Sequence, residues 1–239
     1  MATGRIYRPE ASEGTLLDLP EIGRLHIGMK SDKGYPMSID WFRATGKYSA
    51  LFAKALGEKP ATIQVVFPSD DAGKVCNERY EYRDDKGALV ARGDGQVFEV
   101  WDGRKYAPYM VEQYPDIMRQ ITAKNPTKRG DDNWDIVLTL RFIVPAVRGV
   151  VGVWQFSTKG KASSVKNIRE SFDAVQRMRG TVTGTVFDLS VQFAKSNKPG
   201  VNSRYPVVSL VANDNRIEEI REAMSQRENL SLLLGDGKN

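Results

Sequence analysis

The amino-acid sequence predicts an α+β fold in which short, mostly antiparallel strands outnumber helices. Apolar residues recur at every second position between Asp135 and Pro145, as expected of a half-buried strand. The segment that ends near Arg179 instead gathers its apolar residues on one side of a helix. We therefore expect a strand-rich N-terminal lobe with a mostly antiparallel sheet, and a second lobe of β-hairpin, helix and return strands, the two lobes sharing a sheet.

The second lobe is organised around residues 134–188. Its first strand, residues 135–145, precedes a turn at Arg148 and Gly149. A run rich in valine and aromatic residues follows over residues 150–156, and such residues are enriched in strands. Two strands joined by so short a turn predict a hairpin.

A helix is predicted after this hairpin. Ser163 or Ser164 can cap it, because a hydroxyl satisfies backbone N–H groups that the first turn of a helix leaves unpaired. The helix is expected to run to about Arg179, since Gly180 readily adopts the left-handed conformation that ends helices. Residues 181–193 are then expected to return as a strand.

The first lobe is expected to consist mainly of short strands separated by polar turns. The predicted strands occupy residues 23–29, 36–45, 61–67, 79–83, 89–92 and 97–101, and the predicted short helices occupy residues 49–56 and 109–123.

These elements suggest four segments. An N-terminal arm of residues 1–21 precedes the strand-rich lobe of residues 22–124. A polar linker leads to the hairpin-helix-strand lobe of residues 134–211, and residues 212–239 are expected to form a charged C-terminal helix and an apolar tail.

The composition indicates a globular protein without a membrane-spanning segment. Hydrophobic residues make up 41% and charged residues 27% of the 239 residues, which is ordinary for a globular protein. No segment approaches the roughly 20 consecutive apolar residues of a membrane span, and residues 1–13 lack the apolar core of a secretion signal. Cys76 is the only cysteine, so no intrachain disulfide can form, and the expected location is the reducing cytoplasm of a bacterial host.

The residues that usually carry catalysis are scarce. With one histidine, His26, and one cysteine, the chain cannot build a four-ligand zinc site from these residue types, and we predict neither a metal site nor a cofactor. Aspartate pairs at residues 70–71, 84–85 and 131–132 are compatible with a metal-dependent phosphodiesterase, but each lies in a predicted turn, where aspartate is common anyway.

Two groups of residues are candidates for binding. The basic residues on and before the predicted helix either form a solvated surface or meet phosphates or an acidic partner: Lys159, Lys161, Lys166, Arg169, Arg177 and Arg179. Aromatic residues interleaved with arginine and lysine either belong to the core and its rim or stack on single-stranded DNA: Tyr80, Tyr82, Trp101 and Tyr106.

Several short segments, in their order along the chain, resemble the recombination directionality factor family of temperate phages and other mobile genetic elements. Together they cover most of residues 22–211. The segments are Gly-Arg-Leu-His-Ile-Gly at residues 23–28, Val-Phe-Pro-Ser-Asp-Asp at 66–71, Leu-Val-Ala-Arg-Gly-Asp-Gly at 89–95, Gly-Val-Trp-Gln-Phe-Ser-Thr at 152–158 and Gly-Thr-Val-Phe-Asp-Leu at 184–189.

This resemblance implies a non-enzymatic accessory protein of DNA recombination. Such a factor would bind a serine integrase on its recombination sites and switch the preferred reaction from integration to excision. We expect residues 161–179 and neighbouring loops to contact the integrase, with DNA as a further partner. The alternatives are a phage-type single-stranded DNA-binding protein and the metal-dependent phosphodiesterase mentioned above.

Overall fold

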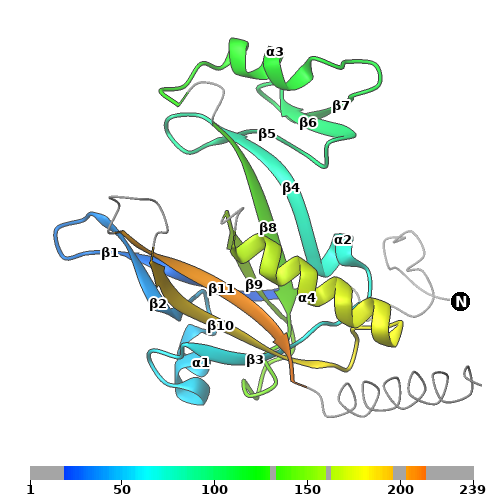
Figure 1. Ribbon diagram of the computed structural model, residues 1–239. Helices are drawn as coiled ribbons and strands as arrows, with labels where there is room; N and C mark the ends of the chain where they lie inside the picture. The colour runs from blue at the N-terminus through cyan, green and yellow to red at the C-terminus, as the bar shows by residue number, and fades with distance from the viewer. Residues whose placement is uncertain (1–18, 130–132, 160–162, 196–202, 214–239) are drawn as a thin grey trace, which may run out of the picture.

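A computed structural model describes residues 19–129, 133–159, 163–195 and 203–213 (Figure 1). Its main element is a large mixed sheet of eight strands in the order β2-β1-β9-β8-β4-β5-β6-β7, in which only β1 and β9 run parallel. The strands are β1 (Glu21–Lys30), β2 (Pro36–Thr45), β4 (Cys76–Arg83), β5 (Leu89–Gly93), β6 (Val97–Trp101), β7 (Tyr106–Met110), β8 (Trp134–Phe142) and β9 (Val153–Thr158).

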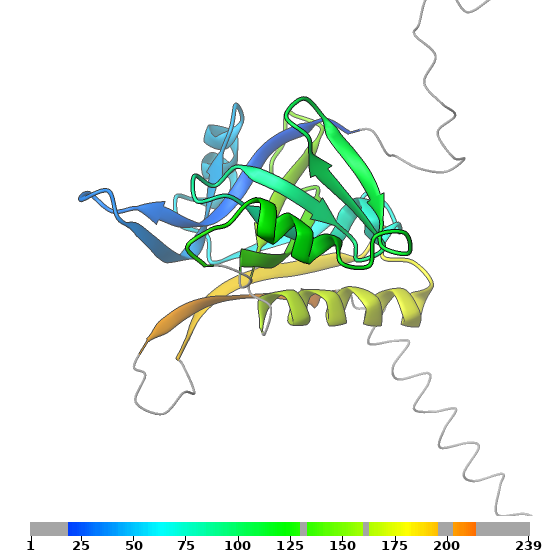
Figure 2. The same ribbon diagram turned by 90° about the horizontal axis from the view of Figure 1, so that it is seen from above.

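A small antiparallel sheet and four helices complete the described fold. The small sheet has the order β11-β10-β3 and consists of β3 (Thr62–Val66), β10 (Val186–Lys195) and β11 (Arg204–Ala212). The helices are α1 (Ser49–Leu56), α2 (Ala72–Val75), α3 (Ile117–Lys124) and α4 (Ser164–Arg179). Figure 2 shows α4, β10 and β11 together on one side of the large sheet.

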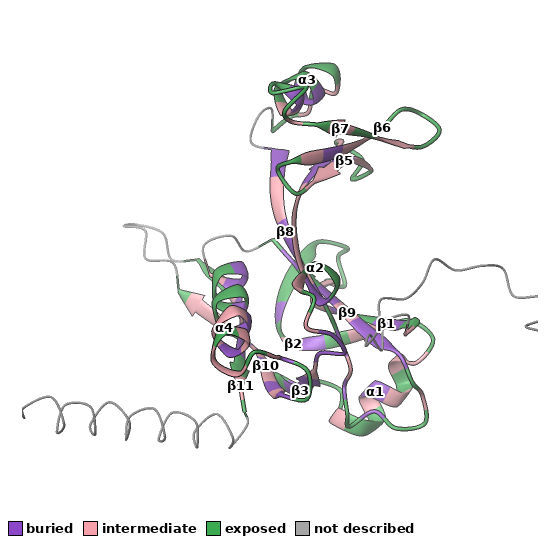
Figure 3. Cartoon of the chain, turned by 90° about the vertical axis from the view of Figure 1, so that its right-hand side faces the viewer, coloured by how far each residue is buried: buried purple, intermediate pink, exposed green. Residues whose placement is uncertain are grey.

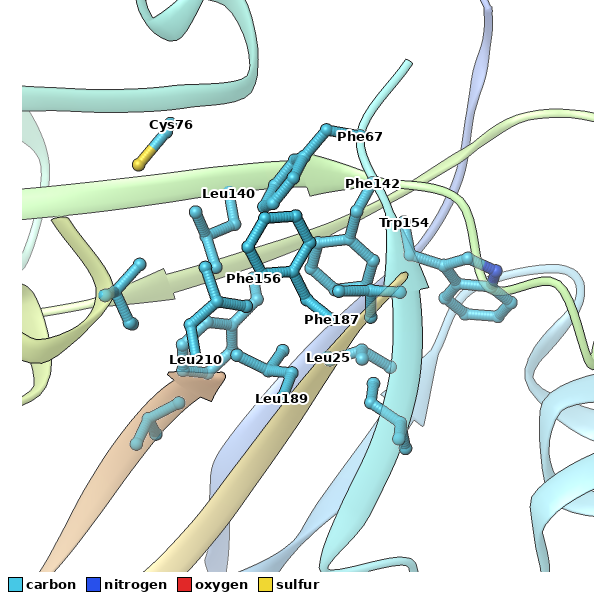
Figure 4. Close-up of a cluster of buried hydrophobic side chains, with 14 of the residues drawn as sticks. Leu25, Phe67, Cys76, Leu140, Phe142, Trp154, Phe156, Phe187, Leu189 and Leu210 are labelled. Atoms are coloured by element: carbon cyan, nitrogen blue, oxygen red, sulfur yellow. The ribbon is translucent and has the colours of Figure 1, made fainter. Parts of the chain in front are cut away.

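The main core fills the space between the two sheets and α4. Leu138, Leu140 and Phe142 on β8 point into it and are at most 1% exposed. Phe187 and Leu189 face them from the small sheet. Figure 4 shows Leu140, Phe142, Phe187 and Leu189 packed together. Burying a side chain of this size contributes about 1.5–3 kcal/mol, so this cluster is what holds the sheets together.

A second, smaller core lies at the far end of β4 and β8. These two strands are paired from Cys76 with Leu140 to Tyr82 with Trp134, and they carry β5, β6, β7 and α3 away from the main body (Figures 1 and 3). Their distal residues are packed with those of β6 and α3. The second core consists of Tyr82, Ala91, Phe98, Ile117, Ile121 and Trp134.

The predicted strand-rich α+β class is confirmed. The hairpin of the second lobe is confirmed as β8 and β9, and the helix predicted to end before Gly180 is confirmed as α4, with Gly180 in the left-handed conformation at φ 76°. The large sheet takes strands from both predicted lobes, because β1 pairs with β9 and β4 pairs with β8.

Two predicted boundaries are wrong. Residues 109–123 are not one helix: Tyr109 and Met110 end strand β7, and α3 begins only at Ile117. The return strand begins at Val186 rather than at Thr181, because residues 181–185 form a loop that is held by side-chain hydrogen bonds instead of strand pairing. Residues 1–18 of the predicted arm of residues 1–21, and the predicted C-terminal helix, lie outside the described residues, and Glu21 already belongs to β1.

Candidate functional site

The large sheet has one covered face and one polar face. In β8 the even-numbered residues face the core, so Val137, Thr139 and Arg141 point to the opposite side. Strand pairing extends this side across the sheet: Arg141 lies beside Gln155 of β9, which lies beside Arg24 of β1. We call this polar side the open face; it comprises Arg24, His26, Arg43, Asn77, Arg79, Glu81, Arg83, Arg92, Glu99, Trp101, Tyr106, Asp135, Val137, Thr139, Arg141, Gln155, Ser157 and Lys159.

Two neighbouring grooves cross the open face. The first has a volume of about 470 Å³ and is bounded by Arg24 and His26 on one side and by β4 on the other. The second, of about 420 Å³, lies over β5 and β6 and includes Arg92. Arg79 lines both grooves, so they meet at β4.

A buried carboxylate organises the arginines where the grooves meet. Glu81 is only 3% exposed, and its two oxygens accept hydrogen bonds from Arg79 and Arg83, each at 2.8 Å. Burial by itself would raise the pKa of Glu81, but the hydrogen bonds from Arg83 and Arg79 and their positive charges outweigh it and hold the pKa below its ordinary value. Glu81 therefore stays ionised and fixes both guanidinium groups.

The distal end of the open face is aromatic. The side chain of Arg92 pairs with Glu99 at 2.6 Å and lies over the ring of Tyr106, with 5.0 Å between the guanidinium carbon and the ring centroid. The centroid of Trp101 is 5.2 Å from that of Tyr106, and Trp101 is 45% exposed. These contacts place a cation and two aromatic rings side by side at the surface.

The other two predicted stacking residues do not belong to this surface. Tyr82 is completely buried in the second core, and its hydroxyl donates a hydrogen bond of 2.6 Å to the carbonyl of Asn125. Tyr80 projects from the same side of β4 as Tyr82 and packs against Phe98. The structure thus joins Trp101 with Tyr106 and removes Tyr82 from the stacking prediction.

The predicted basic residues are divided between two surfaces. On α4, Lys166, Arg169 and Arg177 are exposed, whereas the opposite side of this helix is buried (Figure 3). Arg169 pairs with Glu78 of β4 at 3.2 Å, and Arg179 bonds to Thr185. We call the exposed side of α4 the helix face; it comprises Lys166, Asn167, Arg169, Glu170, Asp173 and Arg177.

Lys159 belongs to the open face instead. Its amino group lies 2.9 Å from Asp135, and it lines the larger groove together with Arg24 and Ser157. Lys161 lies outside the described residues. The five basic residues that the structure describes therefore do not form one continuous patch.

The aspartates of the described pairs accept hydrogen bonds from backbone N–H groups. A single oxygen of Asp70 accepts four hydrogen bonds from residues 181–183, and Asp71 caps α2 by accepting one from Gly73. Asp84 accepts the backbone N–H groups of its own turn, and Asp85 accepts that of Lys128. Among the described residues, no group of three or more histidine, cysteine and carboxylate side chains is arranged to hold a metal ion; Asp131 and Asp132 lie outside them.

His26 and Cys76 are poorly placed for acid-base or nucleophilic chemistry. Burial lowers the pKa of His26, and the positive charges of Arg43 and Arg24 lower it further, so the ring is neutral at pH 7 with one nitrogen 2.9 Å from the hydroxyl of Thr45. Burial raises the pKa of the Cys76 thiol to about 12. A thiol with this pKa is protonated at neutral pH and is a weak nucleophile.

Sequence analysis missed several residues of the open face. Arg24, Arg92, Arg141 and Gln155 were not among the candidates, although the alternation in residues 135–145 already separated Arg141 from the core residues. What the sequence did not supply was the strand order that brings these positions together.

The fold defines a strand-rich α+β protein in which no described helix or strand covers the polar, arginine-rich face of the large sheet. The chain belongs to the Gp3-like family, described as recombination directionality factor-like, whose model matches residues 22–213. Members of this family are generally non-catalytic accessory proteins. No curated protein and no solved structure matches the chain. Within the described residues, no helix is both long and apolar enough to cross a membrane.

Proposed function

We propose that this protein is a recombination directionality factor that binds a serine integrase and changes its preferred reaction from integration to excision. The family match over residues 22–213 carries this proposal. The described residues agree with a binding role, because the aspartates of the pairs at 70–71 and 84–85 accept hydrogen bonds from backbone N–H groups and Cys76 is a buried thiol.

In thermodynamic terms, the factor acts by differential affinity. An integrase bound to its DNA sites can adopt arrangements that favour either reaction, and a ligand shifts such an equilibrium only by the difference between its affinities for the two states. A hundredfold preference for the excision-competent arrangement corresponds to about 2.7 kcal/mol. Binding without such a preference would leave the direction unchanged, whatever its strength.

The helix face is our candidate for the integrase contact. The apolar side of α4, including Ile168 and Phe172, is fully buried, which fixes the helix on the protein. Its outer side presents cations and carboxylates in alternation, a pattern that can pair with a complementary charged helix. Because Lys166 and Arg177 are exposed, reversing their charges leaves the core intact.

The proposal is tested with purified integrase from the same mobile element and labelled DNA carrying the two pairs of recombination sites. Adding the protein is expected to stimulate recombination between the sites that flank the integrated element and to inhibit recombination between the phage and host sites. A pull-down measures binding to the integrase separately. If neither reaction changes although the integrase is active and bound, the proposed switch in direction is wrong.

A variant with Lys166→Glu and Arg177→Glu tests the helix face, and a variant with Arg24→Glu and Arg141→Glu, which makes the same change in charge on the open face, is the matched control. We expect the helix variant to lose integrase binding and stimulation of excision, while the control retains both. Circular dichroism checks that both variants are folded. Equal activity of the helix variant and the unmodified protein would exclude the helix face as the contact.

A further inference from the structure

We propose that the open face binds single-stranded DNA, with arginines on β1, β8, β4 and β5 contacting phosphates and Trp101 with Tyr106 stacking on bases. This activity is separate from the proposed integrase contact, because the helix face lies on the other side of the large sheet. The two interactions can therefore be lost independently.

Charge is the first argument for this partner. The open face and its rim carry more basic than acidic side chains, and the acids are already engaged: Glu21 with Arg24, Glu81 with two arginines, Glu99 with Arg92, Asp135 with Lys159, and Asp94 with the backbone N–H groups of Gln96 and Val97. Arg141 is exposed and forms no ion pair within the described residues. The open face therefore offers a polyanion fixed cations and a net positive charge.

The geometry of the arginines is the second argument. Glu81 holds Arg79 and Arg83 through four hydrogen bonds that use their Nε and Nη2 atoms. Each guanidinium group has five N–H donors, so further donors stay available to a ligand while the side chain is already fixed. Fixed guanidinium groups lose less conformational entropy when they bind a phosphate.

The exposed aromatic pair, Trp101 and Tyr106, favours single-stranded DNA over duplex DNA as the ligand. Every base presents a face that can stack on an aromatic ring, but in a duplex those faces are covered by neighbouring bases. Trp101 is 45% exposed at the end of β6, and Tyr106 supports it from the edge strand β7. Arg92 links this pair to the grooves, because it lies over Tyr106 and also lines the second groove.

The surface is long enough for several nucleotides. Adjacent strands are about 4.8 Å apart, so the path from β1 to β6 across β9, β8, β4 and β5 spans at least about 24 Å. The two grooves follow this path and meet at Arg79. OB folds, which also bind single strands on a sheet surface, take roughly 4–16 nucleotides each.

The test is fluorescence anisotropy with the full-length protein, a fluorescein-labelled 20-nucleotide oligo(dT) and a labelled 20-base-pair duplex, titrated at several salt concentrations. We expect the single strand to bind more tightly than the duplex, with affinity that falls as salt rises. Trp101→Ala is expected to weaken binding to the single strand roughly 5- to 150-fold, the effect of losing one stacked base. Trp101→Phe should restore most of the affinity.

Two matched charge reversals locate the site. Arg141→Glu on the open face is expected to weaken binding and to reduce the slope of log K against log salt by about 0.7, the value for one phosphate contact on a single strand. Arg177→Glu on the helix face makes the same charge change and should leave the slope unaltered. The Arg141→Glu variant should still bind integrase, which separates this proposal from the proposed function.

Several outcomes would overturn the inference. They are undetectable binding to oligo(dT), equal weakening by the two charge reversals, and unchanged affinity of the Trp101→Ala variant. Equal affinity for the duplex and the single strand would point to a general phosphate surface and would likewise contradict a single-strand site.

Discussion

Replacing Asp70 with alanine is expected to lower the free energy of unfolding by about 2–3 kcal/mol. One carboxylate oxygen of Asp70 accepts hydrogen bonds from the hydroxyl and backbone N–H of Thr183, at 2.9 Å each, and from the hydroxyl of Thr181 and the N–H of Val182, at 2.7 Å each. These bonds join the loop after β3 to the loop between α4 and β10, more than 100 positions apart in the sequence.

The magnitude follows from how many of these bonds water can replace. A hydrogen bond to a charged group contributes about 1.5–3 kcal/mol, but Thr183 is exposed and can bind water after the change. Val182 is fully buried, so water cannot replace the hydrogen bond that its N–H loses. We therefore count the equivalent of about one charge-assisted bond and not four. For a protein of this size the loss lowers Tm by roughly 4–12 °C.

The pH dependence gives an independent check. Burial tends to raise the pKa of Asp70, but hydrogen bonds from Thr181, Thr183 and Val182 outweigh it and lower the pKa below its ordinary value of 3.8. A carboxylate with a depressed pKa in the folded state stabilises the protein above the pKa of the unfolded state. This contribution is fully present at pH 7, and it is lost as the pH falls below about 4 and through the folded-state pKa.

Urea unfolding followed by tryptophan fluorescence measures both effects. Asp70→Asn keeps the shape but removes the charge, so its deficit relative to the unmodified protein should shrink as the pH falls below about 4. Asp71→Ala is the matched control, since Asp71 caps only a four-residue helix from an exposed position; its expected cost is about 1 kcal/mol or less. An Asp70→Ala variant within 0.5 kcal/mol of the unmodified protein would refute this account of the loop contact.

Three further changes test the packing. In Gly23→Ala the new Cβ would overlap a ring carbon of Trp154, so overpacking should cost about 1–3 kcal/mol in urea unfolding. Glu81→Gln removes the buried charge between two arginines and should cost about 2–3 kcal/mol at pH 7, with a smaller difference in acid, because the folded-state pKa of Glu81 is depressed. Tyr82→Phe loses the hydrogen bond to Asn125 and should lower stability by about 1 kcal/mol; unchanged midpoints would contradict each expectation.

Local sequence patterns predicted the elements with a clear period. The alternation in residues 135–145 identified β8, and the apolar stripe before Gly180 identified α4 to within a residue. Residues 109–123 misled the analysis because Met110, Tyr114, Ile117 and Ile121 fit helical spacing equally well. Tyr109 and Met110 form a strand because the turn at Asp102 folds them back onto β6, where strand pairing outweighs the local period.

The candidate site could not be predicted from local patterns, because these do not give the strand order or the covered face of the sheet. Tyr80, Tyr82 and Arg79 were grouped because they are neighbours in sequence, but successive residues of a strand point to opposite faces. Only the packing of α3 against Tyr82 determines which face is covered. Similarly, Arg24 and Arg141 are 117 positions apart, and they share a surface because β1 runs parallel to β9.

The paired strands β4 and β8 also set the distance between the two cores. Inserting two residues into each strand near Tyr80 and Ile136 would lengthen the ribbon by about 7 Å and preserve the orientation of every side chain. Inserting one residue into each would turn the distal ends of both strands over, so Tyr82, Trp134 and the α3 that packs on them would come to lie on the side of the open face. Insertions and deletions between Cys76 and Arg83 should therefore keep the two cores on the same side of the ribbon only in even numbers, and only when β8 changes by the same amount.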